Sequence, residues 1–105
     1  RDGEYIPLFK VTPIYPRRAQ ERGIQGYSIV AFTITETGTV EDVVPLEGFC
    51  GDPTDPATEY RKCSIFNSAA SRAALKLKYK PKIVDGNAVK VFDVPHKFTF
   101  ILEDA

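Results

Sequence analysis

The sequence predicts an α+β domain: a three-stranded antiparallel sheet with two helices packed on one face, in the order helix–strand–strand–helix–strand. Residues 26–35 and 88–101 carry apolar side chains at every second position, which is the period of a strand. Residues 66–77 space their apolar side chains by three and four, which is the period of a helix. These periods, separated by turn signals, define the fold class.

The first helix is predicted over about residues 16–22 from its start and stop signals. Pro16 suits the first helical position because its φ is fixed and its missing N–H is not needed there. Gly23 suits the left-handed end of the helix, with Ile24 folding back as the apolar residue after it. Gly26 then frees the backbone before the first strand.

The first two strands are predicted as a hairpin. A strand over residues 26–35 is followed by a turn at 36–38 and a second strand over 39–46, which we expect to end near Pro45. The side chains of the first strand expected on the core face are those of Ser28, Val30, Phe32 and Ile34.

The second helix is predicted to begin near Ser64, a good N-cap residue, and to end by Pro81. An Asp-Gly turn at residues 85–86 leads to the last strand. Because Pro95 lies inside that strand, we expect the strand at a sheet edge or a bulge there. The helix spaces Phe66, Ala70, Ala73 and Leu77 by three and four residues, and by parity one face of the last strand carries Phe92, Val94, His96, Phe98, Phe100 and Leu102.

The composition fits one ordinary globular domain of 105 residues. Fourteen basic and fourteen acidic residues cancel, which does not favour nucleic acid or an anionic membrane as a partner. No apolar run reaches about 18 residues, so the chain predicts no transmembrane helix. The absence of methionine suggests a piece of a longer protein, whose targeting or anchoring segment lies elsewhere.

Cys50 and Cys63 are the only cysteines, and they flank a polar stretch with two prolines. We expect them to form a disulfide that staples the loop 47–63 and contributes about 3 kcal/mol of stability. Such a bond indicates an oxidising compartment. The alternative, a metal pair, is disfavoured because two thiols without nearby histidines make a poor zinc site.

The residues that could carry catalysis or bind metal are sparse. His96 is the only histidine, and its place among apolar side chains favours a structural role over a catalytic one. Asp52, Asp55 and Glu59 lack the ligand spacing of a calcium loop. The sequence therefore predicts neither an enzyme nor a cofactor or metal site. An exposed edge strand instead favours recognition of an extended peptide by strand addition.

One motif resembles a known family. Tyr15, Pro16, Ala19, Gly23, Ile24 and Gly26 match the opening of the TonB C-terminal domain family. The resemblance continues through the hairpin turn at 35–40, through Phe66, Ala70, Ala73 and Tyr79-Lys80-Pro81, and through Val94-Pro95 and Phe98-Thr99-Phe100. It implies a TonB-like domain over residues 13–102, in which 47–63 is an insertion. Residues 1–12 are expected to form an extended lead-in, because Pro7 disfavours a central strand there.

The resemblance also implies a function. TonB-like proteins are anchored in the inner membrane by an N-terminal helix, cross the periplasm and are moved by the ExbB–ExbD motor. Their C-terminal domain binds the TonB box, a short peptide of outer-membrane transporters for iron chelates, haem or cobalamin, as a strand beside its last strand. For this chain the receiving residues would be Val89, Lys90, Val91, Phe92, Asp93 and Val94.

The family's second contacting segment corresponds to Thr12, Tyr15, Pro16 and Arg18. Thr12 stands where the best-known members carry glutamine, and Arg18 matches a basic residue that faces the transporter. For Tyr15, contact with the partner and packing of the first helix are both open. The edge strand could also be covered by residues 5–12 or by a second copy of the domain, and a structural or self-association domain without a transporter partner, including a homodimer, is the alternative function.

Overall fold

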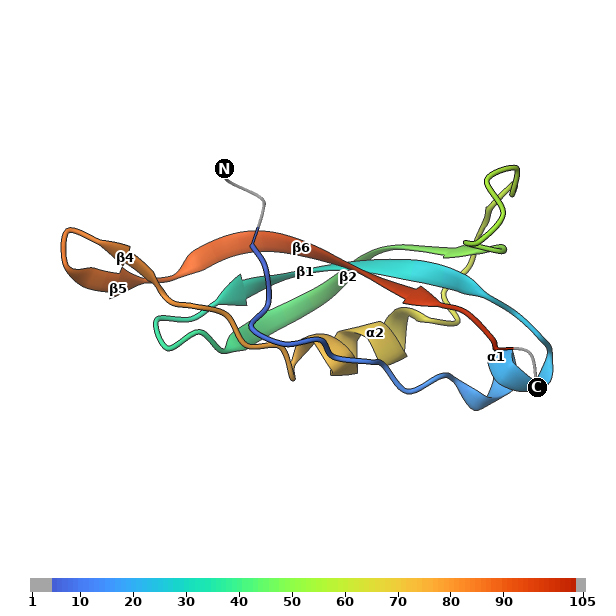
Figure 1. The fold of residues 1–105 in the computed structure, drawn as a ribbon, viewed down its shortest axis with the longest axis horizontal. Coiled ribbons are helices and arrows are strands. Elements are labelled where there is room, and N and C mark those ends of the chain that lie inside the picture. Colours follow the sequence, from blue (N-terminus) through green and yellow to red (C-terminus); the bar gives the residue numbers. More distant parts are fainter. Residues whose placement is uncertain (1–4, 104–105) are drawn as a thin grey trace.

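A twisted antiparallel sheet runs along the long axis of the molecule, and both helices lie against one of its faces (Figure 1). This computed structural model describes residues 5–103, so residues 1–4 of the predicted lead-in lie outside the described part. In chain order the elements are α1 (Arg17–Glu21), β1 (Gly26–Ile34), β2 (Val40–Cys50), β3 (Arg61–Lys62), α2 (Asn67–Ala74), β4 (Lys82–Val84), β5 (Asn87–Val89) and β6 (Val91–Phe100).

The α+β fold class is confirmed, but the sheet has four strands rather than three, in the order β3-β2-β1-β6. The added strand comes from the segment predicted as a loop. β2 continues to Cys50, and β3 pairs there with Phe49 and Cys50. The disulfide between Cys50 and Cys63 is confirmed, and it joins β2 to the chain directly after β3. Irregular chain between the two strands is confined to residues 51–60.

β2 continues past Pro45, where the sequence predicted its end. The pairing with β1 passes from Glu47 directly to Pro45, so Leu46 is the extra residue of a bulge. A second irregularity surrounds Asp42, whose φ is 56°. Bulges accommodate a proline because they interrupt the regular ladder of hydrogen bonds.

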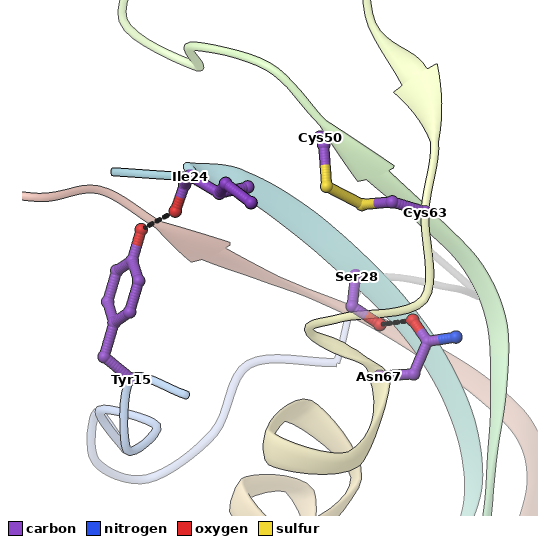
Figure 2. Close-up of a disulfide and its surroundings, with 6 residues drawn as sticks. All are labelled: Tyr15, Ile24, Ser28, Cys50, Cys63 and Asn67. Carbon is purple, nitrogen blue, oxygen red and sulfur yellow. Dashed lines mark hydrogen bonds between the residues drawn. A yellow bond between two sulfur atoms is a disulfide. The ribbon is translucent and has the colours of Figure 1, made fainter. Parts of the chain in front are cut away.

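The predicted core of the first strand and second helix is confirmed. Ser28, Val30, Phe32 and Ile34 are buried, and they lie beneath Phe66, Ala70, Ala73 and Leu77, which are buried too. α2 is shorter than predicted, because it begins at Asn67 instead of Ser64 and ends at Ala74. Asn67 contacts the sheet, since the hydroxyl of Ser28 donates a hydrogen bond of 2.9 Å to its side-chain oxygen (Figure 2).

The predicted last strand is two strands. β5 pairs with β4 in a separate hairpin that turns at Asp85 and Gly86, and β6 begins after Lys90. Within β6, Asp93 has a φ of 57° at a register shift against β1. This irregularity reverses the alternation before it, so Val91 packs against the core while Phe92 is 66% exposed. The expectation that Phe92 shares a face with Val94, Phe98 and Phe100 was therefore wrong, because those three side chains are buried.

The turn after α1 follows its prediction at Gly23, which has a φ of 69°. The N–H of Ile24 returns to the carbonyl of Ala19, which closes the helix. Gly26 is needed for a different reason from the one expected. A Cβ at this position would lie 2.0 Å from the carbonyl oxygen of Phe49, so the close approach of β2 requires the glycine.

Candidate functional site

β6 is an edge strand, because within the described residues it pairs with β1 alone. The pairing of β1 with its two neighbours shows which residues of β6 direct their backbone N–H and C=O groups to the free edge. The carbonyl of Gln25 accepts from the N–H of Gly51, next to β2, so odd-numbered residues of β1 face β2 and even-numbered ones face β6. The β6 residues opposite the even positions, which are His96, Phe98 and Phe100, therefore bond to β1.

The alternate residues of β6 must then direct their N–H and C=O groups to the free edge. Pro95 belongs to this outward set, and its missing N–H removes no ladder bond there. Lys97 and Thr99 follow at the same parity, and each offers an N–H and a C=O to an additional strand. The register from Val94 to Phe100 is continuous against β1.

The opposite edge of the sheet is less regular. β3 covers β2 only at Phe49 and Cys50, and the remaining edge contains two bulges and Pro45. Interruptions of this kind block the addition of a strand. Of the two edges in residues 5–103, that of β6 is the more suitable template.

A groove of about 660 Å³ lies beside this regular part of β6. One wall is the extended lead-in before α1, and the other is the end of β6 together with Leu77, which lies after α2. The lead-in residues that line the groove are Ile6, Pro7, Phe9, Lys10, Val11, Thr12 and Pro13, and the facing residues are Leu77, His96, Lys97, Phe98, Thr99 and Ile101.

The lead-in does not form a strand with β6. The backbone N–H of Leu8 donates instead to the carbonyl of Lys78, with 2.8 Å between nitrogen and oxygen. Tyr5 and Val11 pack against the core and hold the segment at both ends of this contact. The residue after Lys78, Tyr79, donates its N–H to the carbonyl of Gly38 in the hairpin turn, so the lead-in is anchored to the body of the domain through residues 78–79. The groove wall is thus fixed in place while β6 keeps its edge.

Thr12 is exposed and lines the groove, so the structure brings it beside the end of β6. Pro16 precedes α1 as its N-cap residue, with an extended ψ of 131°, rather than being the first helical residue as expected. Arg18 is exposed on α1 and is not among the residues that line the groove.

Tyr15 is used inside the fold. Its hydroxyl donates a hydrogen bond to the carbonyl of Ile24 (Figure 2). Its ring meets Phe66 and Phe100 edge-on, with centroid distances of 5.8 and 5.7 Å. Partial burial raises the pKa of its phenol. These contacts support the packing role for Tyr15, because they join the segment before α1 to the turn before β1, to β6 and to the N-cap of α2.

The segment from Val89 to Val94 does not line the groove. Val89 ends the β4–β5 hairpin, and the ammonium of Lys90 forms an ion pair of 2.7 Å with Glu41 of β2. Val91 and Val94 face the core, and Phe92 and Asp93 are exposed at the irregular start of β6. Of the residues suggested by the sequence, only Thr12 reaches the groove.

The sequence did not single out the apolar lead-in or the end of β6 as a joint surface. A signal was present, because Ile6, Leu8 and Phe9 are large apolar residues next to a proline that disfavours a central strand. In the structure they remain exposed, at 82%, 64% and 52%. What could not be read from the sequence is that Leu77, distant along the chain, forms the floor between them and β6.

The disulfide lies at the other end of β2 from the hairpin turn and near the Ser28–Asn67 hydrogen bond (Figure 2). At this end of the sheet, the rings of Tyr27, Phe49 and Tyr60 form a cluster, and the ammonium of Lys97 lies 4.3 Å from the centroid of Tyr27. This cluster fixes the end of the irregular segment 51–60 onto the sheet.

Residues 5–103 contain no cluster of three or more histidine, cysteine or acidic side chains suited to a metal ion. In the same part of the chain, every helix is too short or too polar to span a bilayer.

Comparison with known proteins gives consistent matches. A family model described as "Gram-negative bacterial TonB protein C-terminal" matches residues 11–48. Protein TonB of Pseudomonas aeruginosa is 32% identical over 88 residues, which are 84% of this chain and 22% of that protein. The chain thus corresponds to a small part of its curated relative.

Two solved structures are similar over nearly the whole chain. The solution NMR structure of the Pseudomonas aeruginosa TonB CTD has a TM-score of 0.66 and 30% identity, and it covers 100% of this chain and 93% of its own. A structure from the molecular characterization of the TonB2 protein of Vibrio anguillarum has a TM-score of 0.59 and 29% identity, with coverage of 98% and 86%. Together with the edge strand and the shared motif around α1, these matches show that the chain belongs to the TonB C-terminal domain family.

Proposed function

We propose that this domain binds the TonB box of outer-membrane transporters by adding it as a strand to β6. The observation that carries the proposal is the continuous free edge of β6, where Lys97 and Thr99 present their N–H and C=O groups beside an open groove. Apolar residues on both groove walls supply contacts for the side chains that alternate along an extended peptide.

The family supports the wider role. We propose that the domain is the periplasmic part of an energy transducer, anchored in the inner membrane by an N-terminal helix outside this chain and driven by ExbB–ExbD. The force would serve uptake of iron chelates, haem or cobalamin. Such a domain acts by binding and not by catalysis, without a cofactor. The disulfide between Cys50 and Cys63 suits an oxidising compartment such as the periplasm.

Residues around the groove would have separate tasks. Thr12 would contact the side of the added peptide from the lead-in wall. Arg18 and Pro16 lie outside the groove, and we propose that Arg18 meets the transporter surface as a rim contact, which affects encounter rate more than affinity. Tyr15 would act indirectly, because its contacts hold the lead-in and α1 against Phe100 of β6. The segment Val89–Val94 would bind only a peptide long enough to extend past Pro95.

The alternative of self-association is supported by a different surface. Ile83 and Val84 of the β4–β5 hairpin and the neighbouring Phe92 are 59%, 43% and 66% exposed. A second copy of the domain could cover these side chains and form a homodimer. Sedimentation of the domain without peptide at rising concentration separates self-association from peptide binding. A homodimer would increase the sedimentation coefficient with concentration, whereas a peptide-binding monomer keeps it constant.

A proline substitution tests the leading proposal. Thr99→Pro removes an outward N–H and places a ring at the free edge, while the bonds of β6 to β1 come from Phe98 and Phe100. We expect it to weaken binding of a synthetic TonB-box peptide roughly tenfold or more, because at least one strand-addition hydrogen bond is lost. Titration calorimetry measures the affinity.

The matched control is Thr99→Ala, which keeps the N–H and should bind the peptide as the wild-type domain does. Both variants should retain the dispersed amide spectrum of the folded domain. Equal affinity of the proline variant and the wild-type domain would contradict strand addition at this edge. Absence of peptide binding by the wild-type domain, even at millimolar concentration, would contradict the proposed function itself.

A further inference from the structure

His96 is a polar side chain on an otherwise apolar part of the groove. It lines the groove together with Leu77 and Phe98, and its ring centroid is 4.7 Å from that of Phe98. It lies between Val94 and Phe98 at the parity that faces the core, but it is only half-buried because the groove opens there.

The described elements around His96 do not use its hydrogen-bonding capacity. Within residues 5–103 no side chain or backbone group forms a hydrogen bond with its imidazole. The residue opposite it on β1 is Val30, which is apolar and fully buried. Leu77, which lies after the end of α2 and lines the groove with His96, is apolar as well. A half-buried imidazole with unused nitrogens is therefore available to a ligand.

Strand geometry determines which part of a peptide would meet this imidazole. If the peptide adds antiparallel to β6, His96, which bonds to β1, stands opposite a peptide residue in a non-hydrogen-bonded pair. Directly opposite residues have their side chains on the same face, and in this kind of pair the two backbones are closest. One side chain of the peptide would thus be placed against His96.

The charges around the groove favour an acidic side chain at that position. Lys10 of the lead-in lines the groove, and Lys78, whose carbonyl holds the lead-in, follows Leu77. Lys97 also lines the groove, but its ammonium lies over the ring of Tyr27. Among residues 5–103, no aspartate or glutamate lines the groove.

We propose that His96 is a specificity-determining residue that selects extended peptides carrying a carboxylate at the position opposite it. This inference rests on the proposed function, because it requires a strand added to β6. The imidazole donates a hydrogen bond to the carboxylate, whereas a purely apolar side chain would cover the imidazole and leave its nitrogens without a partner.

The proposal makes the pH dependence differ between peptides. In the free domain, burial lowers the pKa of His96 below its ordinary value. A carboxylate partner raises this pKa in the complex, so the affinity for an acidic peptide increases as the pH falls from the pKa of the complex to that of the free domain, and it is constant below that. An apolar peptide buries the imidazole further and lowers the pKa in the complex, so its affinity decreases as the pH falls below the pKa of the free domain.

The test uses capped octapeptides of alternating threonine and valine, in which glutamate or leucine replaces each residue in turn. Affinities are measured by titration at pH 8 and at pH 5.5, where glutamate is still ionised. At one position we expect the glutamate peptide to bind more tightly than the leucine peptide. The preference should grow up to about fivefold at the lower pH, as expected for a partly exposed ion pair.

Two variants separate specificity from structure. His96→Gln keeps hydrogen bonding and should retain a preference for glutamate that no longer changes with pH. His96→Leu should reverse the preference in favour of the leucine peptide. A merely structural histidine would change the affinities for both peptides equally in both variants.

The outcomes distinguish the two proposals. If the peptides bind but glutamate gives no gain over leucine at any position, or if the two peptides share one pH profile, His96 does not select the ligand and strand addition stands. If none of the peptides binds to the wild-type domain, while TonB-box peptides of transporters also fail to bind, both proposals are overturned.

Discussion

Tyr15 and Tyr79 both pack their rings against the core, but their hydroxyl groups differ in hydrogen bonding. The hydroxyl of Tyr15 has a partner in the carbonyl of Ile24. That of Tyr79 is buried, and it has no hydrogen-bond partner among the described residues. Burial raises the pKa of Tyr79 to about 12. The ring of Tyr79 contacts Phe32 at a centroid distance of 5.9 Å, so its contribution to the core is apolar.

Tyr79→Phe should therefore leave stability at pH 7 unchanged or raise it by up to about 1 kcal/mol, because the substitution removes a buried hydroxyl without a partner and keeps the ring. Urea unfolding followed by fluorescence or circular dichroism measures the effect. Tyr15→Phe is the matched control, and it should lose about 1 kcal/mol with its hydrogen bond. A larger loss for Tyr79→Phe than for Tyr15→Phe would contradict this assignment.

Tyr79→Phe also has an expected effect at alkaline pH. The folded pKa of Tyr79 lies above the value of 10.0 of an exposed tyrosine, so its contribution to stability is complete below pH 10 and is lost as the pH rises toward 12. Tyr79→Phe should lose less stability than the wild-type domain over this range.

Single residues were predictable where a local constraint acts alone. Gly23 and the turn at residues 85–86 follow from backbone preferences that need no distant partner. The role of Tyr15 was open from the sequence, because its two aromatic neighbours are contributed by elements far along the chain. For His96 the sequence favoured a structural role, since the groove around it exists only once the lead-in is anchored.

At the scale of elements, β3 and the disulfide extend the sheet beyond its predicted three strands. β3 has two residues and pairs with β2 only at Phe49 and Cys50. A strand this short has little stability of its own, and the bond from Cys50 to Cys63 holds the chain next to it. The aromatic contacts of Tyr60 with Tyr27 and Phe49 add to this attachment.

Replacing both cysteines by alanine should destabilise the domain by about 3 kcal/mol, as expected for a closed loop of this length. Urea unfolding of the double variant and of the oxidised wild-type domain gives the difference. Wild-type protein treated with reductant is the second reference, and its free energy of unfolding should approach that of the variant. A loss below about 1 kcal/mol would mean that the aromatic contacts hold the segment without the bond.

The elements that the sequence misplaced are those set by nonlocal pairing. The extra residue Leu46 in β2 and the positive φ of Asp93 in β6 arise where two strands of different local length are matched. One such irregularity was enough to move Phe92 from the core to the surface. Strand periodicity was reliable after Val94, where the register is continuous, and misleading before it.

The whole molecule is elongated, with extents of 50 × 24 × 22 Å. β6 runs along the long axis, with the β4–β5 hairpin at one end and the irregular segment 51–60 toward the other (Figure 1). Under the proposed function, a peptide added along β6 would lie parallel to this axis. A pull along the axis would then load the strand-addition hydrogen bonds together rather than one after another, which suits a domain that transmits force.

Amide hydrogen exchange of β6 is the most direct test of the account. In the free domain the N–H groups of Lys97 and Thr99 should exchange quickly, whereas those of His96 and Phe98 should be protected by β1. On saturation with a TonB-box peptide, exchange at Lys97 and Thr99 should slow markedly. A bound peptide that leaves both amides fast, or protects the edge of β2 instead, would contradict strand addition to β6.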